Sequence, residues 1–177
     1  GIMILDHDLK PGASLPSDLS LSDHVFDVDI TPNRADCACI MGVAREIAAA
    51  TGQKLKRPAI EMVADGPPIE DLTRVTIIDP EGCPRYAAGL IQSVTLGPSP
   101  FWMRYRLYLS GIRSISNLVD VTNYVMLEWG QPLHAFDYDL LLQRAQASGH
   151  EMPSIIMRRA RAGERMTTLD GIEHDLT

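Results

Sequence analysis

Polar side chains gather in one stretch of the chain, between residues 120 and 134, where most neighbouring residues are apolar. They comprise carboxylates, amides, a hydroxyl and an imidazole: Asp120, Thr122, Asn123, Glu128, Gln131 and His134. Buried polar groups need hydrogen-bond partners, so such a row within an apolar helix requires an explanation. Either these groups bind a ligand, or they satisfy one another and the ends of the helix.

Asn123 and His134 are the strongest candidates for chemistry. Asp120 and Asn123 are three residues apart and share one face of a helix, whereas Thr122 points elsewhere unless the backbone is irregular. The neutral ring of His134, in a loop after Pro132, could orient water or act as a base near pH 7. Alternatively, Asn123 is a structural amide and His134 a hydrogen-bonded loop residue. The residue types alone leave both interpretations open.

Other kinds of chemistry lack their motifs. No serine or cysteine stands in an elbow-like turn near His134, so a nucleophilic triad is not supported. The chain has neither a P-loop nor a GxGxxG sequence, so we place no ATP chemistry here. Cys37 and Cys39 do not face one another on a helix and have no further ligands at fitting spacing. We therefore expect no metal site.

The composition indicates a packed protein. The chain has 177 residues, 45% hydrophobic and 22% charged, and a net charge of -7, which disfavours gripping nucleic acid by bulk electrostatics. No apolar run is long enough to cross a bilayer, and the N-terminus does not resemble a signal peptide, so we expect no membrane partner. Three cysteines suggest reduced thiols and a cytoplasmic location. Both ends of the chain look like cuts through a larger protein.

The first part of the chain predicts a strand, a turn and a helix. Residues 1–22 are rich in turns and look like a connector from a preceding domain. Residues 25–30 alternate apolar and polar side chains, which indicates a half-buried strand. Asp36 is the expected N-cap of a helix that ends at Gly52, with the Arg45–Glu46 pair on its solvated face. These elements form a unit over 23–57, followed by a linker over 58–71.

The second part, 72–177, predicts an α/β domain. Its expected strands are 74–78, 86–96, 154–161 and 166–169, the last joined to 172–176 by an Asp170-Gly171 hairpin turn. Ser99 is the expected N-cap of a helix ending at Gly111, and a second helix is expected over 117–129 before Gly130. Residues 131–137 cannot be a simple helix because of Pro132, and 143–153 looks like a polar connection. The predicted fold class is α+β, with mixed sheets and packed helices in two units.

Two long motifs give the chain a resemblance. ITPNRADCACIMGVAREIAA (30–49) and SPFWMRYRLYLSGIRSISNLVDVTNYVMLEWGQPLHAFD (99–137) resemble, in that order, the B1 and B3/B4 regions of phenylalanyl-tRNA synthetase β subunits, and residues 163–176 continue the match. The resemblance covers essentially the whole chain.

The resemblance implies proofreading, the hydrolysis of tyrosine wrongly attached to the phenylalanine tRNA. Carried over by motif, Thr122 and Asn123 would orient the substrate and His134 would position the ester or the attacking water. It also implies an α subunit partner in an α2β2 assembly, a tRNA 3′ end as substrate, and ATP with magnesium acting elsewhere in the enzyme.

The resemblance further implies that the chain ends before a glutamate and small residues of the editing pocket. We therefore expect the chain alone to be inactive, with an exposed edge that promotes self-association. Two alternatives stay open at this point. The chain could be mainly a scaffold of the synthetase, or an unrelated hydrolase that uses His134 as a base.

Overall fold

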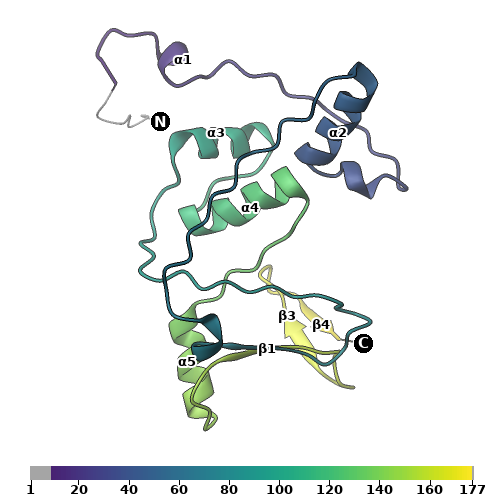
Figure 1. Ribbon diagram of the computed structural model, residues 1–177. Coiled ribbons are helices and arrows are strands. Elements are labelled where there is room, and N and C mark those ends of the chain that lie inside the picture. Colours follow the sequence, from purple (N-terminus) through teal and green to yellow (C-terminus); the bar gives the residue numbers. More distant parts are fainter. Residues whose placement is uncertain (1–8, 177) are drawn as a thin grey trace. The chain divides into compact units, whose positions relative to one another are not determined.

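The computed structural model describes residues 9–176 (Figure 1). Residues 1–8, part of the predicted connector, and Thr177 lie outside the described residues. Helices and two small sheets, one parallel and one antiparallel, confirm the α+β fold class. The chain forms two compact units, one from residues 1–60 and 94–135 and the other from 61–93 and 136–177. The predicted domain limits at residues 23, 57 and 72 stay predictions.

The first unit is helical. It contains α1 (Leu15–Asp18), the short 3-10 turn η1 (Ala35–Cys37), α2 (Ile40–Thr51), α3 (Phe101–Leu109) and α4 (Asn117–Trp129). Helix α4 packs against both α2 and α3. Among the described residues of this unit, the buried apolar side chains are Leu107 of α3 and Met41 of α2.

Helix α4 has the limits that the sequence predicts. The Ser116 hydroxyl accepts a hydrogen bond from the backbone N–H of Val119 (3.4 Å), which satisfies one of the unpaired donors at the helix start. Gly130 ends the helix with φ of 73°, and its N–H bonds to the Met126 carbonyl (2.8 Å). This left-handed conformation suits glycine because it has no Cβ. Gly52 and Gly111, with φ of 67° and 77°, follow α2 and α3 as predicted.

Two predicted N-caps are wrong. Asp36 lies in η1, where its carboxylate binds the Arg34 guanidinium, and α2 begins after Cys39, whose Sγ accepts from the Gly42 N–H (3.3 Å). Ser99 does not cap α3, which begins after Pro100. Its hydroxyl instead donates to the buried carboxylate of Asp120 (2.6 Å). In both cases the side chain binds a charged group and does not cap the helix.

Two predicted strands are absent from the described residues. Segments 25–30 and 86–96 form no ladder there. Phe26 is 77% exposed and Ile91 78% exposed. Alternation of residue types specifies which face a strand would bury, but a strand forms only when a neighbour pairs with its backbone. Residues 9–176 supply no such neighbour for either segment.

The second unit contains a parallel strand pair. Strand β1 (Arg74–Ile77) pairs in register with β2 (Ser154–Met157). Strand β1 corresponds to the predicted strand 74–78. Strand β2 is shorter than the predicted 154–161, because Arg158 and Arg159 turn to the carboxylates of Glu164 and Asp79. The 3-10 turn η2 (Ile69–Asp71) precedes β1.

A helix that the sequence reasoning missed, α5 (Tyr138–Ala147), occupies part of the segment interpreted as a polar connection. Asp137 caps it by accepting from the N–H groups of Asp139 (3.0 Å) and Leu140 (3.2 Å). The hydroxyl of Tyr138 donates to the Leu72 carbonyl (2.9 Å), which holds the start of α5 near β1.

The predicted hairpin is confirmed. Strand β3 (Arg165–Thr167) pairs antiparallel with β4 (Glu173–Asp175). Asp170 accepts hydrogen bonds from the Thr168 hydroxyl and the Ile172 N–H, and Gly171 has φ of 82°.

Among the described residues, no helix has the length and apolar character that a membrane span requires.

Candidate functional site

Asp120 fixes the position of the helix that carries the candidate residues. Its side chain is wholly buried. One carboxylate oxygen accepts from the hydroxyls of Ser99 (2.6 Å) and Ser114 (2.5 Å), and the other from the backbone N–H of Ile115 (2.8 Å). The carboxylate thus ties the first turn of α4 to the segments that precede α3 and α4.

The buried carboxylate of Asp120 is stabilised in its charged form. Burial by itself raises the pKa of an acid, but the hydrogen bonds from Ser114 and Ser99 and from the backbone of Ile115 and Ser116 outweigh burial and hold the Asp120 pKa below its ordinary value. The charge also lies near the N-terminus of α4, where the helix dipole favours an anion. Asp120 is therefore a positioning group for α4.

Asn123 and Thr122 lie on the middle of α4 and are both half-buried. The Thr122 hydroxyl donates to the Val119 carbonyl (2.7 Å), which leaves its oxygen lone pairs able to accept. The Asn123 amide makes no hydrogen bond within residues 9–176, although an amide can donate two and accept two. An amide in this condition has its hydrogen-bonding capacity available for a ligand.

His134 lies exposed in the irregular segment 131–137 that follows Gly130. The sequence prediction that this segment is not a simple helix is confirmed. Asn123 lies about 9 Å along the helix axis from Trp129, the last residue of α4. The loop after Gly130 must therefore fold back along the helix for the imidazole of His134 to reach the amide of Asn123. A shared pocket of Thr122, Asn123 and His134 stays a prediction.

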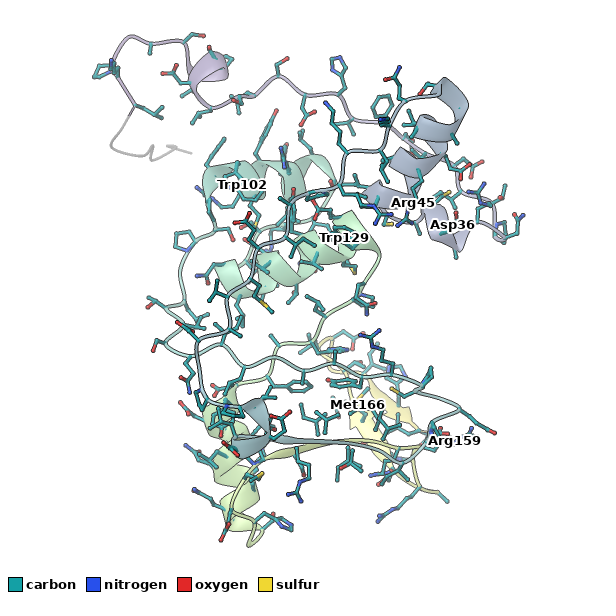
Figure 2. The ribbon with its side chains drawn as sticks, viewed as in Figure 1. Asp36, Arg45, Trp102, Trp129, Arg159 and Met166 are labelled. Carbon is teal, nitrogen blue, oxygen red and sulfur yellow. The ribbon has the colours of Figure 1, made fainter. Side chains whose placement is uncertain are left out.

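A second cluster lies at the start of α2 and centres on Arg34. Its guanidinium binds the carboxylates of Asp36 (2.9 Å) and Glu46 (2.7 Å) and contacts the Cys37 Sγ (3.1 Å). Arg45 and Glu46 are both exposed, as predicted for a solvated helix face, and Glu46 in addition binds Arg34, which the turn before α2 brings to it. Figure 2 shows Asp36 beside α2 and Arg45 on the helix itself.

The charges of this cluster compensate one another. The Arg34 guanidinium lowers the pKa of Asp36 to about 2, and hydrogen bonds to Asp36 and Glu46 raise the pKa of Arg34 above its ordinary value. Burial raises the pKa of the Cys37 thiol, with Asp36 and Glu46 adding to this. Asp36, Cys37 and Glu46 could each offer a ligand atom to a metal, and these atoms lie within 4.8 Å of one another. A guanidinium already lies among them, so the group is an ion-pair cluster.

Two hollows in the surface of the first unit lie beside these clusters. One has a volume of about 240 Å³ and is lined in part by Val28, Arg34, Cys37 and Glu46. The other has a volume of about 590 Å³ and lies between the last turns of α3 and the segment that follows it. Neither lining includes Thr122, Asn123 or His134.

Sequence reasoning missed Ser99 and Ser114 as partners of Asp120. Ser99 stands before a proline, where the local pattern predicts a helix cap, and Ser114 lies in an irregular segment that has no sequence pattern. Only an unexplained carboxylate in an apolar helix signalled that such donors exist.

The comparisons with known proteins agree with the resemblance. The sequence profile of the B3/4 domain family matches residues 82–177, more than half of the chain. The chain belongs to this family.

The chain is also similar over its whole length to phenylalanine–tRNA ligase β subunits. It is 51% identical over 176 residues to the subunit of Moorella thermoacetica, and 49% identical over 177 residues to that of Geobacter sulfurreducens. In both cases the match covers at least 99% of this chain but 21% of the relative, so the chain spans about a fifth of the relatives' length. The resemblance read from the motifs is confirmed, and the alternative of an unrelated hydrolase is contradicted.

Proposed function

We propose that the chain is part of the β subunit of a phenylalanine–tRNA ligase and that its B3/4 region removes tyrosine from mischarged phenylalanine tRNA. Similarity over the full chain supports the first statement. The half-buried Asn123 amide, available for a ligand on a helix fixed by Asp120, supports the second.

The editing reaction answers a physical limit on selectivity. Phenylalanine and tyrosine differ by one hydroxyl, and an apolar pocket rejects an added hydroxyl only weakly. A second site with polar groups aimed at that hydroxyl gains a hydrogen bond from tyrosine that phenylalanine cannot supply. Such a site selects the wrong product for hydrolysis.

We assign roles to three side chains in this reaction. Asn123 and Thr122 orient the bound tyrosyl group, Asn123 through its amide and Thr122 through the lone pairs that its bond to Val119 leaves unused. His134 positions the ester or the attacking water. An activated water attacks the ester carbonyl, and the tRNA hydroxyl leaves with a proton. Further residues of the pocket lie beyond this chain.

The remaining functions of the enzyme belong elsewhere in the assembly. We propose an α subunit partner in an α2β2 enzyme and a tRNA 3′ end as substrate, with ATP and magnesium used outside this chain. Residues 23–57 form the B1-like part and 72–177 the first part of the B3/B4 domain. The free thiols of Cys37, Cys39 and Cys83 support a cytoplasmic location.

The test measures deacylation of tyrosyl-tRNA by the full-length enzyme. We expect Asn123→Ala and His134→Ala to slow deacylation by about a hundredfold or more, the usual size of acid–base and positioning effects. Phenylalanine attachment should stay unchanged in both variants. His150→Ala is the matched control, because His150 is an exposed histidine in the other unit. Editing at parental rates by both variants would show that these residues have no role in it.

A scaffold role for the first unit is the second candidate, favoured by the exposed apolar side chains of 25–30. Under this hypothesis, Phe26→Ser weakens assembly with the α subunit and leaves deacylation by the assembled fraction unchanged. Analytical ultracentrifugation of the mixed subunits measures the first effect. Normal assembly of Phe26→Ser, together with lost deacylation in Asn123→Ala, would favour the editing role instead.

A further inference from the structure

The larger hollow of the first unit has a lining suited to an anion. Its volume is about 590 Å³, and it is lined by the last turns of α3 and the turn after it: Arg104, Tyr108, Gly111, Ile112, Arg113 and Ser114. The lining contains two arginines and no carboxylate. The lining thus has a local excess of positive charge, although the chain has a net charge of -7.

Arg104 has hydrogen-bonding capacity that the protein does not use. Its Nε is buried and has no hydrogen-bond partner in the part of the chain that the structure describes. The guanidinium carbon lies 5.7 Å from the centre of the Phe101 ring, which limits where the group can turn. Because this nitrogen is buried, an anion in the hollow would be bound by the two Nη groups of Arg104, which also make no hydrogen bond within residues 9–176.

Four other arginines of the chain have carboxylate partners. Arg34, Arg158, Arg159 and Arg165 each bind a carboxylate. Across residues 9–176, Arg104 and Arg113 have no ion pair. Asp120, whose carboxylate accepts from the Ser114 hydroxyl, is wholly buried and is not among the lining residues, and it forms no ion pair with Arg104 or Arg113 among the described residues.

We infer that this hollow binds a phosphate group of a single-stranded RNA. A guanidinium fork matches the oxygens of phosphate in charge and geometry. Tyr108 borders the same hollow and is 74% exposed, which leaves an aromatic ring on which a base can stack. Arginine beside an exposed aromatic ring is the combination with which proteins hold single strands without reading their sequence. The choice of RNA as the source of the phosphate rests on the proposed function.

The test measures binding of a short fluorescein-labelled single-stranded RNA to the full-length enzyme by anisotropy at several salt concentrations. We expect Arg104→Gln and Arg113→Gln each to weaken binding by about tenfold, the loss of one charge-assisted hydrogen bond. Each should also reduce the salt-dependence slope by about 0.7, the value for one phosphate contact to a single strand. Arg104→Lys keeps the charge without the fork and should weaken binding less than Arg104→Gln.

Arg45→Gln is the matched control, since Arg45 is exposed on α2 and lies outside the hollow. Circular dichroism confirms that each variant keeps its helices. RNA affinities and slopes of the Arg104 and Arg113 variants equal to those of Arg45→Gln would overturn the inference. Displacement of the RNA by inorganic phosphate at equal concentration would overturn the assignment to RNA.

Measuring tyrosyl-tRNA deacylation beside RNA affinity distinguishes failure of this inference from failure of the proposed function. If the parent enzyme does not deacylate tyrosyl-tRNA but its RNA affinity depends on Arg104, the proposed function fails and the phosphate site stands. If His134→Ala loses deacylation at unchanged RNA affinity and the arginine variants bind like the parent, the proposed function stands and the phosphate site fails.

Discussion

Replacing Asp120 should loosen the start of helix α4 more than any exposed change nearby. In Asp120→Ala, the hydroxyls of Ser99 and Ser114 and the N–H of Ile115 all lose their acceptor in a buried place. In Asp120→Asn, the amide oxygen can still accept from Ile115, and the amide nitrogen can donate to the serine oxygens, which rotate their own protons away. The two variants therefore remove different amounts of the same network.

The expected magnitudes follow from this difference. Each hydrogen bond to a charged group contributes roughly 1.5–3 kcal/mol, and part of the sum is offset by the burial cost of the carboxylate that alanine removes. We expect Asp120→Ala to lower the local free energy of unfolding by about 4 kcal/mol and Asp120→Asn by about 1–2 kcal/mol. These values correspond to backbone exchange that is faster by roughly a thousandfold and roughly tenfold.

Hydrogen exchange by mass spectrometry on the full-length protein measures both values in peptides that cover residues 111–130, because local opening controls exchange there. Asp139→Ala is the control, since Asp139 is an exposed acid in the first turn of α5. It should change exchange in its own helix by less than about tenfold. Equal exchange of Asp120→Ala and the parent protein in α4 would refute the reasoning.

Two further predictions concern a close packing contact and a titration. Gly42→Ala should destabilise α2 by about 2 kcal/mol or more despite the better helix propensity of alanine, because a Cβ there would lie 1.8 Å from the Asp36 carbonyl oxygen. Thermal unfolding measures this loss of stability. Gly66→Ala is the control and should be neutral, because a Cβ on Gly66 would lie in open space. The Arg158 hydrogen bond lowers the pKa of Glu164 to about 2 from 4.5. The stabilisation from this ion pair is therefore present above pH 4.5 and is lost as the pH falls towards 2. Carboxyl NMR titration of Glu164 should show a midpoint near 2, and a midpoint that stays near 2 in Arg158→Gln would contradict the assignment.

Local signals predicted helix ends well where the residues that form them are neighbours in sequence. Ser116 and Gly130 bracket α4, and Asp170 with Gly171 makes the hairpin, because caps and turns need only a few consecutive residues. The same logic overlooked α5, although Asp137 stands where an N-cap belongs. The polar residues from Gln143 onwards led us to interpret this region as a connection and not as a helix.

Predictions failed where a distant partner decides the outcome. Segment 25–30 has a strand pattern, but no pattern states which backbone will pair with it. Ser99 has the residue type of a cap, yet it donates to the carboxylate of Asp120, which the fold brings near. Asp36 likewise has the residue type of a cap, but it binds the guanidinium of its neighbour Arg34. The candidate site of Thr122, Asn123 and His134 stays a prediction. The polar row around Asn123 marked the helix, while the donors to Asp120 were visible only once the chain was folded.

Glycine at position 130 places the two long sequence motifs in direct contact. A Cβ on Gly130 would lie 3.3 Å from the Cβ of Cys39, so the end of α4 touches the start of α2. A shortened protein that begins in the linker after residue 57 would lack Cys39 and α2 and leave this end of α4 uncovered, just ahead of the loop that carries His134. Cutting the chain after residue 57 would therefore disturb the loop that carries His134, although the shortened protein would still contain that loop.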